Sequence, residues 1–339
     1  MTLKDIANAA GVSISTVSRI LNGNSVNAAS KEVQDRIWEI ARAGGYIPNA
    51  SAQSLKAGNS TRKLTKSIAC IYARSTDAKN DAFFSTLTRS MEQEALKEGF
   101  IVKYSFSAYD IHNPATHHQI INNEVDGVAV LGRCDKDTLK FLKLHFKKVV
   151  YAGLNALDAE YDQVICDGYA VAADAMEYLF QLGHERIGYI GEMQNEVRYL
   201  AYRDALKKHH IPLDKNLVIN VPISSDGGYQ GAKRILASAE DVTAFFCIND
   251  ITAIGALKAI QDCNYKIPED ISVISMDDID ISQYVSPMLT TMHIPIEEIG
   301  KMTAKILIDR INNGHTLPLK ISLPYYLVKR ESCAIRKRL

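Results

Sequence analysis

Apolar residues recur at helical spacing in three short stretches at the start of the chain. The first stretch begins with Thr2 and Asp5 as a capping pair and ends at Gly11. Ser13 and Ser30 are placed to cap the second and third helices. The apolar stripes comprise Leu3, Ile6, Ala7 and Ala10; Ile14, Val17, Ile20 and Leu21; and Val33, Ile37, Ile40 and Ala41. Two short helices around a glycine turn predict a helix-turn-helix, although an ordinary small helical bundle has the same pattern.

Residues 49–66 hold few large apolar side chains and many Ala, Ser, Lys and Gly residues, which predicts a linker. From residue 67 onward, apolar runs of strand length alternate with helical stripes. One series of runs comprises Ser67–Ala73, Phe100–Phe106, Val125–Leu131 and Lys148–Ala152, and a second comprises Arg186–Ile190, Leu217–Val221, Thr243–Ile248 and Ile271–Met276. This alternation indicates parallel sheets with helices on both faces. We therefore predict nine or ten strands in two doubly wound α/β subdomains, behind a small all-α head.

The composition of the chain is that of a soluble globular protein. Its 339 residues are 47% hydrophobic and 23% charged, which excludes a disordered or fibrous chain. Because no run of about 18 apolar residues occurs, we predict no membrane span. The N-terminus lacks the features of a signal peptide, so we expect a cytoplasmic protein. Six widely spaced cysteines without a C-x-x-C pair favour reduced thiols over disulfides or a zinc site.

The formal net charge of zero conceals an uneven distribution along the chain. Residues 1–63 contain eight basic and four acidic side chains, a net charge of +4, so the remaining residues carry −4. A basic head suits the phosphate backbone of double-stranded DNA. On the second predicted helix, Ser15, Thr16, Ser18 and Arg19 take exposed early positions. Arg19 can pair bidentately with guanine, and the hydroxyls suit phosphates or base edges.

Four segments of the head resemble the signature of the lactose/galactose repressor (LacI/GalR) family. They are Leu3–Ala7, Ala10–Ser13, Thr16–Gly23 and Gly45–Asn49. The resemblance implies that a hinge helix after residue 49 forms on DNA, with Leu55 wedged into the minor groove. It implies these DNA contacts: Ile14, Ser15, Thr16, Ser18, Arg19, Asn49, Ala52 and Leu55. Val33 departs from the family pattern, which often has a phosphate-contacting threonine at that position.

Three further blocks resemble the effector domain of the same family, so the likeness covers nearly the whole chain. They are Leu182–Ile190, Asn249–Leu257 and Ile271–Asp278. The resemblance implies a helix-turn-helix domain at 1–48, a hinge helix and linker at 49–66, and an effector-binding and dimerisation domain at 67–339. The last would have two subdomains of periplasmic-binding-protein type, at about 67–165 plus 295–323 and 166–294 plus 324–339.

Polar residues follow three of the predicted strands: Asp167, Asn249–Asp250 and Asp277–Asp278. Ligands bind at the carboxyl ends of strands in open parallel sheets, where carboxylates and amides can bind sugar hydroxyls. For each residue alone, capping of the next helix is the commoner role. The resemblance instead implies these effector contacts: Phe84, Asp167, Arg198, Ile223, Asn249 and Asp277. Ile223 stands where a second aromatic wall of the pocket is usual.

The resulting hypothesis is a homodimeric transcriptional repressor that binds a near-palindromic operator and is controlled by a small molecule. Asn80–Phe84 and Ser224–Tyr229 resemble the members that repress galactoside-utilisation genes, which implies a sugar effector such as galactose or a galactoside. A regulator that responds to a purine or a protein co-repressor is one alternative. A sugar receptor without a role on DNA is another.

The sequence gives little support to an enzyme, and we expect no cofactor and no metal. The glycine-rich Gly227–Lys233 lacks the Lys-Ser/Thr ending of a phosphate-binding loop, and no acid/base pair is placed. His112, His117 and His118 could suggest a metal site. Their region is polar and contains Asn113–Pro114, so we predict a solvated loop there.

Overall fold

The computed structural model describes residues 2–21, 29–43, 46, 64–73, 81–239 and 241–336, apart from the side chains of residues 42, 43, 117, 118, 121 and 122. The head contains three helices, α1 (Leu3–Ala10), α2 (Ile14–Leu21) and α3 (Lys31–Ala43). Thr2 and Asp5 form the predicted capping box, and Gly11 ends α1 in the left-handed conformation at φ 69°. The Ser13 hydroxyl accepts the Thr16 backbone N–H at the start of α2. The local signals thus set the ends of these helices as predicted.

The core of the head contains most of the predicted apolar stripes. Its buried members are Ile6, Ala7, Ala10, Val17, Ile20, Leu21, Ile37 and Ala41. Ile14 is an exception, because 48% of its surface is exposed although its spacing placed it on the buried stripe of α2. Val33 and Ile40 pack against this core while only partly buried. The three helices therefore form one small unit, with Ile14 on its outside.

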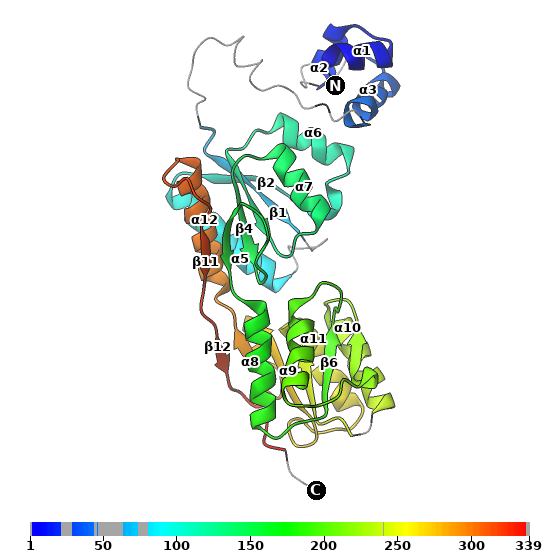
Figure 1. Ribbon diagram of the computed structural model, residues 1–339, viewed down its shortest axis with the longest axis vertical. Helices are drawn as coiled ribbons and strands as arrows, with labels where there is room; N and C mark the ends of the chain where they lie inside the picture. Colours follow the sequence, from blue (N-terminus) through cyan, green and yellow to red (C-terminus); the bar gives the residue numbers. More distant parts are fainter. Residues whose placement is uncertain are drawn as a thin grey trace.

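The body contains two six-stranded sheets (Figure 1). The first has the order β11-β5-β4-β3-β1-β2 and is parallel throughout. Its strands are β1 (Ser67–Tyr72), β2 (Ile101–Ser107), β3 (Gly127–Leu131), β4 (Val149–Gly153), β5 (Asp162–Ile165) and β11 (Lys320–Ser322). Its helices are α5 (Ala82–Lys97), α6 (Pro114–Asn122), α7 (Lys136–His145) and α12 (Ile296–Ile311). We call this part, with its helices, the first subdomain.

The second sheet has the order β12-β10-β9-β8-β6-β7 and is parallel except for β12, which runs antiparallel to β10. Its strands are β6 (Ile187–Gly191), β7 (Val218–Asn220), β8 (Ala244–Cys247), β9 (Ser272–Asp277), β10 (Thr290–His293) and β12 (Tyr326–Val328). Its helices are α8 (Gly168–Gln181), α9 (Val197–Lys208), α10 (Ser225–Ser238) and α11 (Asp250–Asp262). We call this part the second subdomain. Short 3-10 turns occur at Ala108–Asp110, Lys215–Leu217 and Asp280–Gln283.

The predicted fold class is confirmed, with two corrections. The described residues contain twelve strands instead of nine or ten, because β10, β11 and β12 have only three or four residues each and no long apolar run. The solvated loop predicted for His112, His117 and His118 is confirmed only at His112, which lies in an exposed turn. Residues 114–122 form α6, since Asn113 caps the Ala115 N–H and Pro114 occupies the first turn.

Two glycines allow α10 and α11 to pack with their backbones in contact. A Cβ on Gly228 would lie 1.9 Å from the carbonyl oxygen of Thr252, and one on Gly255 would lie 1.8 Å from that of Ser225. Both distances are far below any real contact, so a side chain at either position would force the helices apart. Helix packing therefore explains Gly228 in the glycine-rich stretch before Lys233.

The six cysteines are all free thiols. Among the described residues, no helix is both long enough and apolar enough to cross a membrane.

The C-terminal end of α12 is fixed by an ion-pair cluster that includes His315. Asp162, which is buried, accepts two hydrogen bonds of 2.7 Å from Arg310 and one of 3.0 Å from His315, and the other nitrogen of His315 contacts Asp309. The hydrogen bond with Asp309, and then the one with Asp162, raises the pKa of His315 above its usual value. Burial acts to raise the pKa of Asp162, but its hydrogen bonds outweigh this effect and lower it.

This cluster predicts a specific dependence of stability on pH. Because the pKa of His315 is raised in the folded state, its stabilising effect is complete below the unfolded value of about 6.5 and is lost as pH rises through the folded pKa. The thermal midpoint of the unaltered chain should therefore fall toward that of His315→Gln as pH increases from 6 to 9. A constant difference between the two midpoints across this range would contradict the prediction.

Candidate DNA-contact face and ligand cleft

The outward face of α2 carries the residues predicted to contact DNA. Val17, Ile20 and Leu21 point into the core of the head, which leaves the other side of the helix at the surface. Ile14, Ser15 and Arg19 are exposed, and Thr16 and Ser18 are half-buried. Three other predicted contacts, Asn49, Ala52 and Leu55, lie outside the described residues.

A cavity of about 90 Å³ lies where the carboxyl ends of the two sheets face each other. From the first subdomain it is lined by Asp81, Phe83, Phe84, Gly132, Arg133, Gly153, Leu154 and Asn155. From the second it is lined by Glu196, Arg198, Ile223, Asn249 and Asp277. Because both subdomains contribute walls, any movement of one against the other changes the shape of this cleft.

Five of the six predicted effector contacts come together at this cleft: Phe84, Arg198, Ile223, Asn249 and Asp277. Asp167 does not line it. Its carboxylate caps α8 by accepting the backbone N–H groups of Tyr169 and Ala170, and its side chain is exposed. Asp167 therefore has the helix-capping role and not the predicted role of an effector contact. Asn249 combines both roles, since it caps α11 through the Thr252 N–H and also lines the cavity.

Arg198 is held rigidly on the cavity wall. Its Nε and Nη2 donate to the two oxygens of Glu196 at 2.7 and 3.0 Å, and its Nη1 donates to the carbonyl of Ile248 at 3.0 Å. Burial acts to lower the pKa of Arg198, but the adjacent Glu196 carboxylate more than offsets this, so the pKa lies above its usual value. The guanidinium therefore stays charged in a site from which water is largely excluded.

Asp277 is the least satisfied polar group of the cleft. Its side chain is buried, and its Oδ1 has no hydrogen-bond partner among the described residues. Burial, and then the nearby charge of Asp250, raises the pKa of Asp277 well above its usual value. Its backbone has φ 122° and that of Asp278 has φ 58°, conformations that cost non-glycine residues free energy and concentrate at functional sites. A buried oxygen of this kind calls for a partner that the chain does not supply.

Asp250 lies beneath the cavity surface and holds the segments that carry Asp277. Its carboxylate is fully buried and accepts hydrogen bonds from the hydroxyls of Ser275, Thr291 and Ser282 and from the N–H of Ile279. These partners belong to β9, β10 and the turn between them. Asp250 thus fixes the backbone on which Asp277 is carried, instead of facing the ligand itself.

Comparison with known proteins decides the family. Residues 2–49 match the model of bacterial regulatory proteins of the lacI family, and residues 176–333 match the periplasmic binding protein-like domain. The HTH-type transcriptional repressor MelR of Bacillus subtilis is 30% identical over 98% of this chain and 97% of its own length. The chain belongs to the lacI family. It is a DNA-binding transcriptional repressor with a ligand-binding domain, as the sequence predicted.

Solved structures of lacI-family regulators share the fold along the chain. A transcriptional regulator CelR-cellobiose complex is 25% identical, with a TM-score of 0.73, over 98% of this chain and 99% of that one. A LacI family transcriptional regulator from Enterococcus faecium with bound ribose is 29% identical, with a TM-score of 0.69, over 80% of this chain and all of that one. The relatives are named as a transcriptional repressor and as transcriptional regulators, not as enzymes, which agrees with the expectation from the sequence.

Several cleft residues of this lacI-family repressor were not predicted from its sequence. Asp81 caps α5 by accepting the N–H groups of Phe83 and Phe84. Arg133 and Glu196 bond to each other across the cleft at 3.1 Å. Arg133 follows the buried strand β3 by two residues, so the strand-end rule that selected Asp277 would also have selected it.

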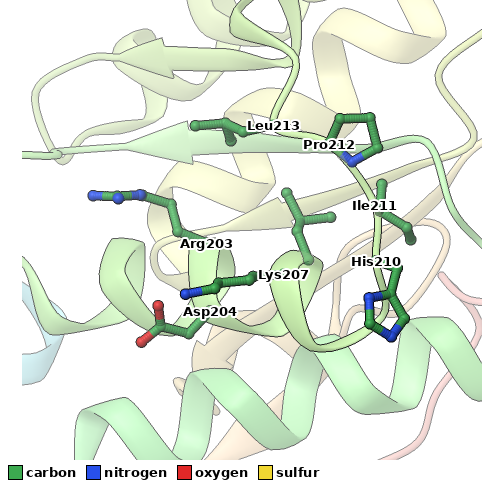
Figure 2. Close-up of a pocket in the computed structure, with 8 residues that line it drawn as sticks. Arg203, Asp204, Lys207, His210, Ile211, Pro212 and Leu213 are labelled. Atoms are coloured by element: carbon green, nitrogen blue, oxygen red, sulfur yellow. The ribbon is translucent and has the colours of Figure 1, made fainter.

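The repressor has a second hollow, of about 560 Å³, in the second subdomain; it shares no lining residue with the cleft, and we call it the outer hollow (Figure 2). It is lined by Arg203, Asp204, Leu206, Lys207, His210, Ile211, Pro212 and Leu213, all from the end of α9 and the segment after it. Its one carboxylate, Asp204, already accepts the hydroxyl of Tyr169. Buried polar groups from different elements converge at the cleft and not at this hollow, so the cleft is the candidate ligand site. Among the described residues, no cluster of three or more potential metal ligands occurs.

Proposed function

We propose that this repressor binds a neutral, hydroxyl-rich small molecule, most simply a sugar, in the cleft. The observation that carries the proposal is the buried Oδ1 of Asp277, which lines the cavity without a partner among the described residues. A sugar hydroxyl can donate to this oxygen, and Phe84 offers an apolar ring from the wall of the other subdomain. Cellobiose and ribose in the related regulators support this class of ligand.

The charges of the cleft favour a neutral ligand over an anionic one. Of the described cations, Arg133 and Arg198 line the cavity, and each is already paired with a carboxylate of the protein. A phosphate or uronate group would enter beside Asp277 and Asp81 without an available cation among the described side chains. Burying a charge without a partner costs several kcal/mol. Sugar phosphates should therefore bind poorly.

The size of the cavity implies that the cleft must open to admit a sugar. Ligand pockets usually measure about 300–1,000 Å³, whereas this cavity measures about 90 Å³. We propose that ligand binding changes the relative position of the two subdomains and, through the hinge, the affinity for a near-palindromic operator bound by a cytoplasmic homodimer. Couplings of about 1–3 kcal/mol, or about 5- to 150-fold in affinity, are typical of such control.

Thermal stabilisation of the full-length repressor tests the ligand class. Galactose, glucose, ribose and cellobiose would be compared with galactose 1-phosphate, glucose 6-phosphate and ribose 5-phosphate, and with hypoxanthine and guanine. A neutral sugar at about 100 times its Kd should stabilise the fold by about 2.7 kcal/mol, while its phosphate should give no shift. Stabilisation by a phosphate ester, or by the nucleobases alone, would overturn the sugar assignment.

On the DNA side, we expect Arg19→Ala to weaken operator binding by about 1–3 kcal/mol and to relax the preference for one base. The reason is that Arg19 is exposed on the outward face of α2, where a guanidinium can reach guanine. Gel shifts on the operator and on single-base variants measure both effects. Arg36→Ala, an exposed arginine on α3, is the control and should leave the base preference unchanged. If Arg19→Ala weakened binding to every DNA sequence equally, Arg19 would contact only phosphate and would not read a base.

A further inference from the structure

We infer that Arg133 is a latch that holds the two walls of the cleft together and sets how readily the cleft opens. This inference rests on the proposed function in one respect: opening of the cleft is what admits the ligand. Arg133 lies in the first subdomain, directly after β3. All three groups to which it donates lie in the second subdomain, in the loop that follows β6. A single guanidinium therefore connects the two walls of the cleft.

The contacts of this latch use both terminal nitrogens of Arg133. Nη1 donates to the backbone carbonyl of Asn195 at 2.6 Å and to Oε2 of Glu196 at 3.1 Å. Nη2 donates to Oε2 of Glu192 at 3.3 Å. The acceptors lie in the second subdomain, 59 to 63 residues away in sequence, so these contacts hold only while the two walls of the cleft lie close together. Opening the cleft must break these contacts.

The environment makes the latch stronger than a surface ion pair. The Arg133 side chain is 21% exposed and the Glu196 side chain 2% exposed, so solvent screens this pair little. Glu196 also accepts a hydrogen bond from Arg198. Its carboxylate therefore connects Arg133 of the first subdomain to Arg198 of the second. A change at the latch is thereby transmitted directly to a residue that lines the cavity.

The latch also accounts for the small cavity. With Arg133 seated on the opposite loop, the cleft retains only about 90 Å³. Releasing Arg133 separates the walls, and the cost of that release is part of the free energy that a ligand must supply. Lysine cannot replace the arginine fully, because its single ammonium lacks the planar fork that reaches both Asn195 and Glu192.

Hydrogen–deuterium exchange on the full-length protein without any ligand tests the latch. In Arg133→Ala, amides in 131–135 and 192–197 should exchange faster by about threefold or more, while β9 keeps its protection. Arg133→Lys should lie between this variant and the unaltered chain. Glu192→Gln, which keeps an acceptor oxygen but removes the negative charge facing Arg133, should produce a smaller change in the same two segments.

Arg186→Ala is the matched control. Arg186 binds two carboxylates, Asp214 at 2.9 Å and Asp241 at 3.0 Å, but all three residues belong to the second subdomain. Its loss should speed exchange near 214 and 241 and leave the cleft segments unchanged. Unchanged exchange in 131–135 and 192–197 of Arg133→Ala, or equal acceleration there in Arg186→Ala, would overturn the latch. Because no sugar is present, that outcome would leave the sugar proposal standing, and failure of the thermal-shift screen would leave the latch standing.

Discussion

Arg198→Ala is expected to abolish the ligand response while operator binding stays within a few-fold of the unaltered repressor. Arg198 is buried on the cavity wall and paired with Glu196, so its removal deletes a donor and leaves a buried carboxylate with one cation fewer. Breaking such a buried pair costs about 3–5 kcal/mol of stability, and because Glu196 lines the same cavity we expect the altered wall to lower ligand affinity by at least about tenfold. The measurements are thermal shift with the sugar that most stabilises the unaltered chain, and a gel shift with and without that sugar.

Arg203→Ala provides the control for Arg198→Ala. Arg203 lies on the same helix, α9, but it is exposed, stacks over Tyr199 and lines the outer hollow of Figure 2. We expect its replacement to leave the ligand response intact. The opposite pattern, with response kept in Arg198→Ala and lost in Arg203→Ala, would move the ligand from the cleft to the outer hollow.

Asp250→Ala is expected to lower the free energy of unfolding of the body by about 3–5 kcal/mol, because each buried donor left without a partner costs about 1–3 kcal/mol. The substitution leaves the hydroxyls of Ser275, Thr291 and Ser282 and the N–H of Ile279 without their acceptor. Urea unfolding followed by circular dichroism measures the loss.

Asp280→Ala is the control for this loss, since Asp280 is exposed and accepts only a local hydrogen bond from Gln283 among the described contacts. Its replacement should change stability by less than about 0.5 kcal/mol. If Asp250→Ala were as stable as Asp280→Ala, the buried network would not hold β9 and β10 together.

Features that depend on near neighbours in the sequence could be predicted well. Thr2, Gly11 and Ser13 act as caps because their hydrogen bonds or backbone angles are satisfied within three or four residues. The long buried strands were visible for the same reason, since an apolar run such as that of β3 is buried on both faces wherever it lies in a parallel sheet. The edge strands β11 and β12 were missed because they have three residues each, none of them fully buried, and only pairing with a distant strand defines them.

The sequence by itself determined the family, the caps of the head and the polar side chains at the strand ends. The tertiary structure decided what each strand-end residue does. Asp167, Asp250 and Asp277 follow or end buried strands in similar contexts, yet the first caps an exposed helix start, the second is a buried support and the third faces the cavity with an unpartnered oxygen. The physical reason is that a carboxylate's role depends on what removes it from water. The segments that bury a carboxylate are distant from it in sequence. Arg133 shows the same dependence, because its hydrogen-bond acceptors lie about 60 residues away.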